Sequence, residues 1–293
     1  MHKAGFVNIV GNPNVGKSTL MNQLVGEKLS IATFKAQTTR HRIMGIVNTD
    51  DAQIVFSDTP GVLKPNYKMQ EMMLQFSESA LADADILLYV TDVVENPEKN
   101  MDFLDKVSKM TIPVILLINK IDESGQKKLG NLVETWHKLL PNAEILPLSA
   151  KNKFGIDILM KRILELLPES PAFFDKDQLT DKPAKFFVSE IIREKILRYY
   201  DKEIPYSVEV VIERFKEDDR QIHINAIIYV ERSSQKGIII GHQGMALKKV
   251  STEARKSLER FFDKKIFLET YVKVDKDWRN SQKELNNFGY NPE

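Results

Sequence analysis

The sequence predicts an α/β domain, whose mostly parallel sheet is covered by helices, followed by a smaller α+β domain. Apolar runs of strand length alternate with helix-compatible stretches over the first 170 residues, which is typical of a parallel sheet buried on both faces. Two later runs, 207–215 and 221–231, alternate apolar with polar residues around a short polar turn, as an antiparallel hairpin does. A polar stretch separates the two patterns. We therefore expect domains at 1–170 and 185–293, joined by a linker at 171–184.

Composition limits the class of protein. The 293 residues carry a formal net charge of +1, so any surface that attracts polyanions must be local. Cysteine is absent, which excludes disulfides and thiolate chemistry and suits a reducing compartment. No apolar run approaches the roughly 20 residues of a membrane-spanning helix, and no signal-peptide pattern precedes the first strand-like run. We expect a cytoplasmic protein.

The first strand-like run, residues 6–10, leads into GNPNVGKS at 11–18, and a helix-compatible stretch follows. Glycines at both ends of this loop allow its N–H groups to turn inward, and the helix adds its positive end, so phosphates are attracted. Lys17 is expected to reach the β- and γ-phosphates, and Ser18 to hold Mg²⁺. This motif predicts a nucleotide-binding protein. Its expected binding residues are Gly11, Asn12, Asn14, Val15, Gly16, Lys17, Ser18 and Thr19.

A second motif, Asp58-Thr59-Pro60-Gly61, follows another apolar run. A carboxylate at the carboxyl end of a buried strand is placed to hold Mg²⁺ through water, and glycine lets its own N–H approach a γ-phosphate. The polar segment 33–42 reads by itself as an ordinary exposed connection. Because the metal of a phosphate-loop enzyme needs a further protein ligand, we expect that segment to supply a threonine. The expected magnesium ligands are Ser18, Thr39 and Asp58.

Two short blocks, NKID at 119–122 and SAK at 149–151, predict the base that is bound. The Asp122 carboxylate can accept hydrogen bonds from the N1–H and 2-amino groups of guanine, a pattern that adenine does not offer. Asn119 and the stem of Lys120 complete this pocket, and the Ala150 amide is placed to meet the guanine O6. The flanking residues of the second block, Ser149 and Lys151, are included in the expected site.

A glycine-bounded turn in the second domain predicts nucleic-acid binding. Ile240-Gly241-His242-Gln243-Gly244 lies between an apolar segment and a basic one that begins with Lys248 and Lys249. A G-x-x-G turn alone is weak evidence, and a basic helix is usually a solvated face. The preceding hairpin and the strand-like run 266–274 favour RNA binding, because this order resembles the KH module, whose turn clamps about four single-stranded nucleotides.

The blocks GNPNVGKS, KAQTTRHR, DTPG, NKID and SAK are similar to those of translation-factor-class GTPases, and their order and wording resemble the Era family. The likeness covers nearly the whole chain, through the KH-type region to the ending at 278–290. It implies a GTP-hydrolysing switch that uses GTP/GDP and Mg²⁺, binds small-subunit ribosomal RNA near its 3′ end and assists assembly of the small ribosomal subunit. A monomer is expected.

The catalytic water is not assigned to a side chain. Many GTPases carry a glutamine directly after the D-x-x-G block, whereas this chain has Val62. The resemblance suggests that Asn14 recruits a K⁺ ion beside the phosphates; the alternative is that Asn14 only shapes the turn. The residues expected to assist hydrolysis are Lys17, Asn14, Thr39 and Gly61.

The RNA-binding turn departs from the family pattern, since KH loops usually carry a basic residue between the glycines and this one has His242 and Gln243. We therefore expect backbone amides, together with Lys248 and Lys249, to make the contacts with RNA phosphates. Two other functions stay open. One is an RNA chaperone whose nucleotide is structural, and the other is a signalling GTPase associated peripherally with the inner face of the cell membrane through its basic helix.

Overall fold

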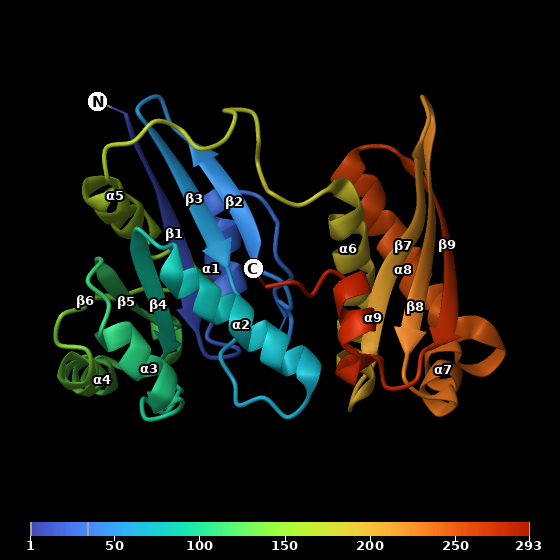
Figure 1. Cartoon of the computed structure of the whole chain (residues 1–293), viewed down its shortest axis with the longest axis horizontal. Helices are drawn as coiled ribbons and strands as arrows, with labels where there is room; N and C mark the ends of the chain where they lie inside the picture. Colours follow the sequence, from blue (N-terminus) through green and yellow to red (C-terminus); the bar gives the residue numbers. More distant parts are fainter. Residues whose placement is uncertain (1, 34, 293) are drawn as a thin grey trace. The chain divides into compact units, whose positions relative to one another are not determined.

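The computed structural model describes residues 2–33 and 35–292; Phe34, within the predicted polar segment, and the chain ends Met1 and Glu293 lie outside the described residues. The chain divides into two compact units (Figure 1). The first contains the residues up to Asn66 and Gln70–Asp181, and the second contains Lys182–Asn291 together with Tyr67–Met69. Each unit is described by itself.

The first unit is built on a six-stranded sheet in the order β2-β3-β1-β4-β5-β6. Every neighbouring pair is parallel except β2 and β3, which are antiparallel, so the predicted mostly parallel sheet is confirmed. All residues of β3 and β4 are buried, as expected for strands covered on both faces. The strands are β1 (Lys3–Gly11), β2 (Ile43–Asn48), β3 (Ala52–Asp58), β4 (Ile86–Asp92), β5 (Val114–Asn119) and β6 (Glu144–Pro147).

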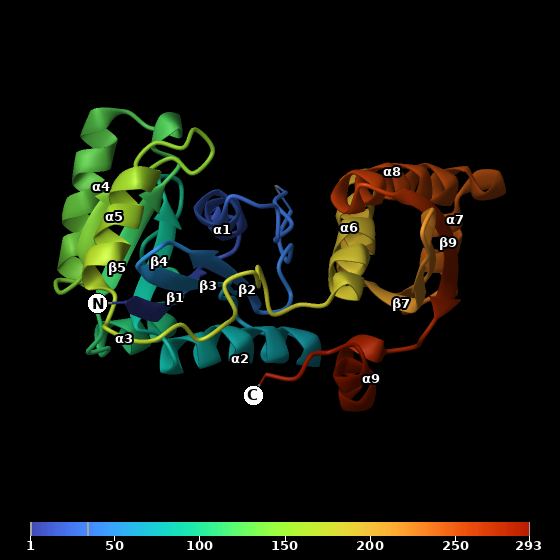
Figure 2. The ribbon, with the colours of Figure 1, turned by 90° about the horizontal axis from the view of Figure 1, so that it is seen from above.

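Helices cover both faces of this sheet. Those of one face share a hydrophobic core that includes Phe103, Trp136 and Tyr89, and Figure 2 shows α2 and α3 on the side of the sheet opposite to α1 and α5. Two helices, α2 and α4, were not assigned from the sequence. The helices are α1 (Lys17–Val25), α2 (Lys68–Ala82), α3 (Met101–Ser108), α4 (Gln126–Leu139) and α5 (Ile156–Leu166), with a 3-10 turn, η1 (Ile121–Glu123).

The predicted linker is attached to the first unit along much of its length. The Ile46 N–H donates to the Leu179 carbonyl at 2.8 Å, and the Thr180 hydroxyl donates to the Met44 carbonyl at 2.7 Å. The side-chain oxygen of Gln53 accepts hydrogen bonds from the backbone N–H groups of Phe173 and Phe174. This segment therefore pairs with the otherwise open edge strand β2, which protects the unsatisfied backbone groups of that edge.

The second unit has a three-stranded sheet in the order β7-β8-β9. Strands β7 and β8 form the predicted antiparallel hairpin, and β9 lies parallel to β8. Alternate residues of β8, from Ile222 to Val230, enter a core shared with α6 and α8. The elements are α6 (Ala184–Tyr199), η2 (Ile204–Tyr206), β7 (Val208–Glu217), β8 (Gln221–Val230), α7 (Ser233–Ile240), η3 (His242–Gly244), α8 (Met245–Phe262), β9 (Lys265–Val274), η4 (Trp278–Asn280) and α9 (Gln282–Asn287).

The C-terminal segment is an ordered part of the second unit. Trp278, Leu285 and Tyr290 are fully buried, and the Tyr290 hydroxyl donates a hydrogen bond of 2.8 Å to the Glu209 carboxylate on β7. A search of the described residues finds no helix with the length and apolar character needed to cross a membrane.

Candidate functional site: a nucleotide pocket and an RNA-binding turn

The loop at 11–18 connects β1 to α1, and its glycines are required by their surroundings. Gly11 has φ +146°, and a Cβ there would lie 2.1 Å from the Val90 carbonyl oxygen. Gly16 has φ +98°, and its Cβ would lie 2.2 Å from Nδ2 of Asn119. No other residue type fits at these two points. The loop therefore lies close against β4 and β5 while it turns into the helix.

Lys17 is buried at the centre of this loop. Its Nζ donates hydrogen bonds to the carbonyls of Gly11 and Asn12, at 3.0 and 2.9 Å. Burial lowers the pKa of Lys17 from 10.5 to about 8, although the charges of Asp58 and Glu95 oppose this shift. A buried ammonium group at the start of a helix is a strong attractor for phosphate oxygens, since these replace the hydration that the cation has lost.

Ser18, Thr39 and Asp58 come together from α1, the polar segment and the end of β3. The Ser18 and Thr39 hydroxyls are 2.8 Å apart, and the Thr39 hydroxyl donates to Oδ2 of Asp58 at 3.1 Å. Burial raises the pKa of Asp58, against the effect of the nearby Lys17 charge. Its other oxygen, Oδ1, is buried and has no hydrogen-bond partner among the described residues. An orphaned carboxylate oxygen beside two hydroxyls fits Mg²⁺, which prefers oxygen ligands and keeps several waters.

The described residues contain no group of three or more His, Cys, Asp or Glu side chains that could hold a metal ion. The magnesium set predicted from the sequence has one carboxylate and two hydroxyls, so it belongs to the class of sites in which nucleotide phosphates and water complete the coordination.

The residues expected around the base also lie together. The Asn119 side chain donates to the Val15 carbonyl at 2.8 Å and accepts from the Ala150 N–H at 3.0 Å. The Ser149 hydroxyl donates to Oδ1 of Asp122 at 2.6 Å, which orients this carboxylate. Asn119 therefore joins the phosphate loop to the loop that follows β6. The amide of Ala150 is already used by Asn119, a contact that the sequence did not indicate.

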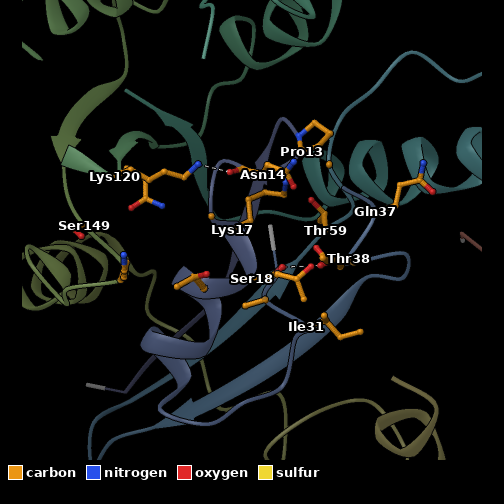
Figure 3. A pocket seen from close by; sticks show the side chains of 18 of the residues that line it. Pro13, Asn14, Lys17, Ser18, Ile31, Gln37, Thr38, Thr59, Lys120 and Ser149 are labelled. Carbon is orange, nitrogen blue, oxygen red and sulfur yellow. Dashed lines mark hydrogen bonds between the residues drawn. The ribbon is translucent and has the colours of Figure 1, made fainter. Parts of the chain in front are cut away.

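A cavity of about 560 Å³ connects these parts. Figure 3 shows Lys17 and Ser18 in the middle of it, with Lys120 at one side and Thr38 at the other. Of the residues predicted for the nucleotide site, the following line the cavity: Asn14, Gly16, Lys17, Ser18, Thr19, Thr39, Gly61, Asn119, Lys120, Asp122, Ser149 and Lys151. The others do not line it and are buried: Gly11, Asn12, Val15, Asp58 and Ala150.

Several lining residues were missed by the sequence analysis. Most belong to the connection between α1 and β2, which has no periodic pattern to reveal which side chains face inward. Only one feature of the sequence could have indicated that this connection lines the site, namely its position between the phosphate loop and the strand that ends in the D-x-x-G motif. The missed residues are Pro13, Ile31, Ala32, Thr33, Gln37, Thr38, Thr59 and Glu123.

Val62, which occupies the place of a water-orienting glutamine, is directed into the protein core. It is 4% exposed and belongs to the hydrophobic cluster that contains Val10 and Tyr89. Its N–H donates to the Gly11 carbonyl at 3.0 Å. Gly61 beside it lines the cavity, and a Cβ there would approach the Pro13 Cα to 2.7 Å. The segment is therefore held against the phosphate loop through its backbone.

The G-x-x-G turn of the second unit lies between α7 and α8. Gly241 and Gly244 have φ values of +72° and +75°, and Gln243 has φ +49°. His242 and Gln243 are exposed, whereas Ile240 is half-buried. Lys248 is exposed and makes no ion pair with any described residue, while Nζ of Lys249 lies 4.5 Å from the centre of the Tyr199 ring. Both lysines are exposed beside the turn.

Taken together, a phosphate loop, a magnesium ligand set and a guanine-type pocket on a parallel sheet define a P-loop GTPase, here followed by a KH-type unit. Residues 6–120 match a family model described as a 50S ribosome-binding GTPase, and residues 203–279 match the KH domain. The chain is 44% identical to the GTPase Era of Clostridium kluyveri, over 99% of this chain and 100% of that protein. It is 45% identical to the GTPase Era of Leuconostoc citreum, over 99% and 97%. The chain belongs to the Era family of GTPases.

Solved structures of Era show the same fold over both units. One is Era in complex with MgGDPNP and nucleotides 1506–1542 of 16S ribosomal RNA, with a TM-score of 0.95, 39% identity and 99% coverage of each chain. Another is a variant of Aquifex aeolicus Era bound to GDP·AlF4⁻, with a TM-score of 0.94, 38% identity and coverage of 98% of this chain and 99% of that one.

Proposed function

We propose that this GTPase is a molecular switch that binds small-subunit ribosomal RNA near its 3′ end and assists assembly of the small ribosomal subunit in the cytoplasm. The observation that carries the proposal is the cavity that unites Lys17, Thr39 and Asp122. Support for the RNA target comes from the related Era that is bound to nucleotides 1506–1542 of 16S ribosomal RNA. The exposed G-x-x-G turn between α7 and α8 supplies the matching element in this chain.

Hydrolysis in this proposal depends on charge stabilisation rather than on a side chain that orients water. Lys17 binds the β- and γ-phosphates, and the Gly61 backbone meets the γ-phosphate. Mg²⁺, when bound by Ser18, Thr39 and Asp58, neutralises charge on the phosphate oxygens. Since Val62 is buried in the core, it cannot contact the attacking water. The intrinsic rate is therefore expected to be low, and Asn14 is the place where K⁺ would add positive charge.

The site assignments and the domain limits, 1–170, 171–184 and 185–293, are part of the proposal. So are the RNA contacts of residues 240–244, Lys248 and Lys249. The protein is proposed to act as a monomer, which light scattering in solution checks.

The test is multiple-turnover phosphate release from GTP, with and without a small-subunit RNA fragment that contains the 3′ end. We expect slow turnover that the RNA alters. Tight nucleotide binding without turnover would instead support the RNA chaperone with a structural nucleotide. Binding to the RNA fragment and to anionic vesicles, each titrated with salt, separates the ribosomal function from the membrane-associated one. Preference for vesicles would contradict the proposal.

A further inference from the structure

Asn100, at the start of α3, binds two separate loops of the nucleotide site with one side-chain amide. Its Nδ2 donates to Oδ1 of Asn12 at 2.6 Å and to the Val62 carbonyl at 2.9 Å. Asn12 belongs to the phosphate loop, and Val62 follows Gly61 of the D-x-x-G motif. These two hydrogen bonds use both donors of the amide.

Asn12 is itself held from its other side. It is 2% exposed. Burial raises the pKa of the neighbouring Glu95, and hydrogen bonds from Thr91 and Asn12 oppose that rise. The Thr91 hydroxyl donates to Glu95 at 2.9 Å. A polar chain therefore runs from the end of β4 through Glu95 and Asn12 to Asn100. None of these hydrogen-bonded residues lines the cavity. They therefore influence the nucleotide site through the phosphate loop and not by contact with the nucleotide.

The segment that Asn100 holds contains the predicted contact of the γ-phosphate. The hydroxyl of Thr59 donates to the Ile9 carbonyl at 2.8 Å, and the hydroxyl of Ser77 donates to the Pro60 carbonyl at 2.8 Å. After Gly61, the Val62 N–H is bound by Gly11 and the Val62 carbonyl by Asn100. The backbone is thus fixed on both sides of Gly61, and Asn100 provides the last of these attachments.

We propose that Asn100 is a positioning residue for GTP hydrolysis. It fixes the Gly61–Val62 backbone against the phosphate loop, so that Gly61 is in place for the γ-phosphate. This inference rests on the proposed function of the cavity. Because no side chain orients the water at position 62, the reaction depends strongly on how accurately the backbone is placed. GDP lacks the γ-phosphate, so we expect loss of the Asn100 amide to affect GTP more than GDP, even though Asn100 also contacts Asn12 of the phosphate loop.

Two variants test this without straining the backbone. Asn100 has φ +58°, a left-handed conformation that Asn, Asp and Gly tolerate and Ala does not. Asn100→Gly removes the amide, and Asn100→Asp keeps the size but replaces two N–H donors with an acceptor-only carboxylate. For both we expect kcat for GTP to fall about tenfold. Affinity for a non-hydrolysable GTP analogue should fall several-fold, while affinity for GDP stays within about twofold.

Asn96→Gly is the matched control, since Asn96 is exposed in the same loop and its side chain accepts a hydrogen bond from the Glu98 N–H at 3.0 Å. We expect this variant to hydrolyse GTP as the unmodified protein does. Thermal melting shows whether each variant is folded, and Asn100→Asp still provides the test if Asn100→Gly is not.

The inference is overturned if Asn100→Asp keeps the unmodified kcat. It is also overturned if affinities for GDP and the GTP analogue fall equally, because Asn100 would then support the whole site as a structural residue. Failure of the unmodified protein to bind GDP or to hydrolyse GTP would refute the proposed function itself. That result would be obtained before any variant is compared, so the two failures are distinguishable.

Discussion

Nζ of Lys120 donates a hydrogen bond of 2.7 Å to the backbone carbonyl of Asn14. The same ammonium group pairs with Asp92 at 2.6 Å, so a residue of the base pocket fixes the phosphate loop to the end of β4. Asn14 is thereby held through its backbone in a left-handed conformation, φ +67°. Its exposed side chain makes no hydrogen bond to any of the described residues. The side chain remains available for a ligand at the cavity.

Because the Asn14 side chain is available at the cavity, a K⁺ site there can be tested directly. Hydrolysis is expected to be several-fold faster in K⁺ than in Na⁺ at equal ionic strength, because a cation near the bridging oxygen stabilises the developing negative charge. Asn14→Gly should remove the difference and retain GDP affinity, since glycine tolerates this φ and alanine does not. Phosphate release is measured in both salts. Equal rates for the unmodified protein would leave Asn14 with a structural role alone.

Guanine recognition is expected to depend on Asp122. Asp122→Asn replaces an acceptor with a donor, so that affinity for GTP should fall one to two decades while xanthosine triphosphate gains affinity; an unsatisfied polar group costs about 1–3 kcal/mol. Competitive titration with both nucleotides measures the change. Glu123→Gln is the control, because it removes a negative charge from the same cavity without altering the guanine contacts. A GTP affinity that is unchanged in Asp122→Asn would refute this pocket.

RNA binding is expected to depend on the G-x-x-G turn and to be separable from hydrolysis. A Cβ on Gly241 would lie 2.6 Å from that of Ala246, so a substitution there distorts the turn itself. Gly244 has open space around it, and its φ of +75° is a left-handed conformation that Asp adopts more readily than most residue types. Gly244→Asp should weaken binding of the 3′ RNA fragment at least tenfold, because it places negative charge where a phosphate approaches. Intrinsic GTP hydrolysis should be retained.

Gly237→Asp offers a control for that experiment. Gly237 lies in α7, has open space around it and carries no positive φ. The same negative charge is thus added to the same unit, in the helix before the turn and four positions ahead of Gly241, whose N–H donates to the Gly237 carbonyl. Equal loss of RNA affinity in Gly237→Asp and Gly244→Asp would indicate a general charge effect and contradict a specific role of the turn.

Nucleotide affinity is expected to decrease above pH 8. Burial lowers the pKa of Lys17 to about 8. The phosphates require the charged ammonium group, so binding takes up a proton once Lys17 is neutral. Affinity for GDP should then be constant below the lowered pKa and fall about tenfold per pH unit above it. Titrations stop below the pH at which guanine N1–H ionises. Lys17→Met should bind GDP weakly, and its GDP affinity should not fall in this way above pH 8. A GDP affinity of the unmodified protein that does not change with pH would contradict the coupling between Lys17 protonation and binding.

The sequence alone was sufficient to predict the elements whose characteristic residue pattern lies within a short stretch of chain. The phosphate loop was recognised because glycine is needed at Gly11 and Gly16, and the core strands because their apolar runs are nearly continuous. The alternation of apolar residues in β8 was enough to predict a hairpin. Each of these signals lies within one short stretch of chain, so no knowledge of distant contacts was needed.

Only the tertiary structure decided which distant residues meet. The pairing of Thr180 with β2 and the inward position of Val62 depend on contacts that no local pattern encodes. The amide of Asn100 reaches Asn12 across 88 positions in the chain. Hydrogen-bond donors on irregular loops have no period, so their partners are defined only when the sheet brings the loops together.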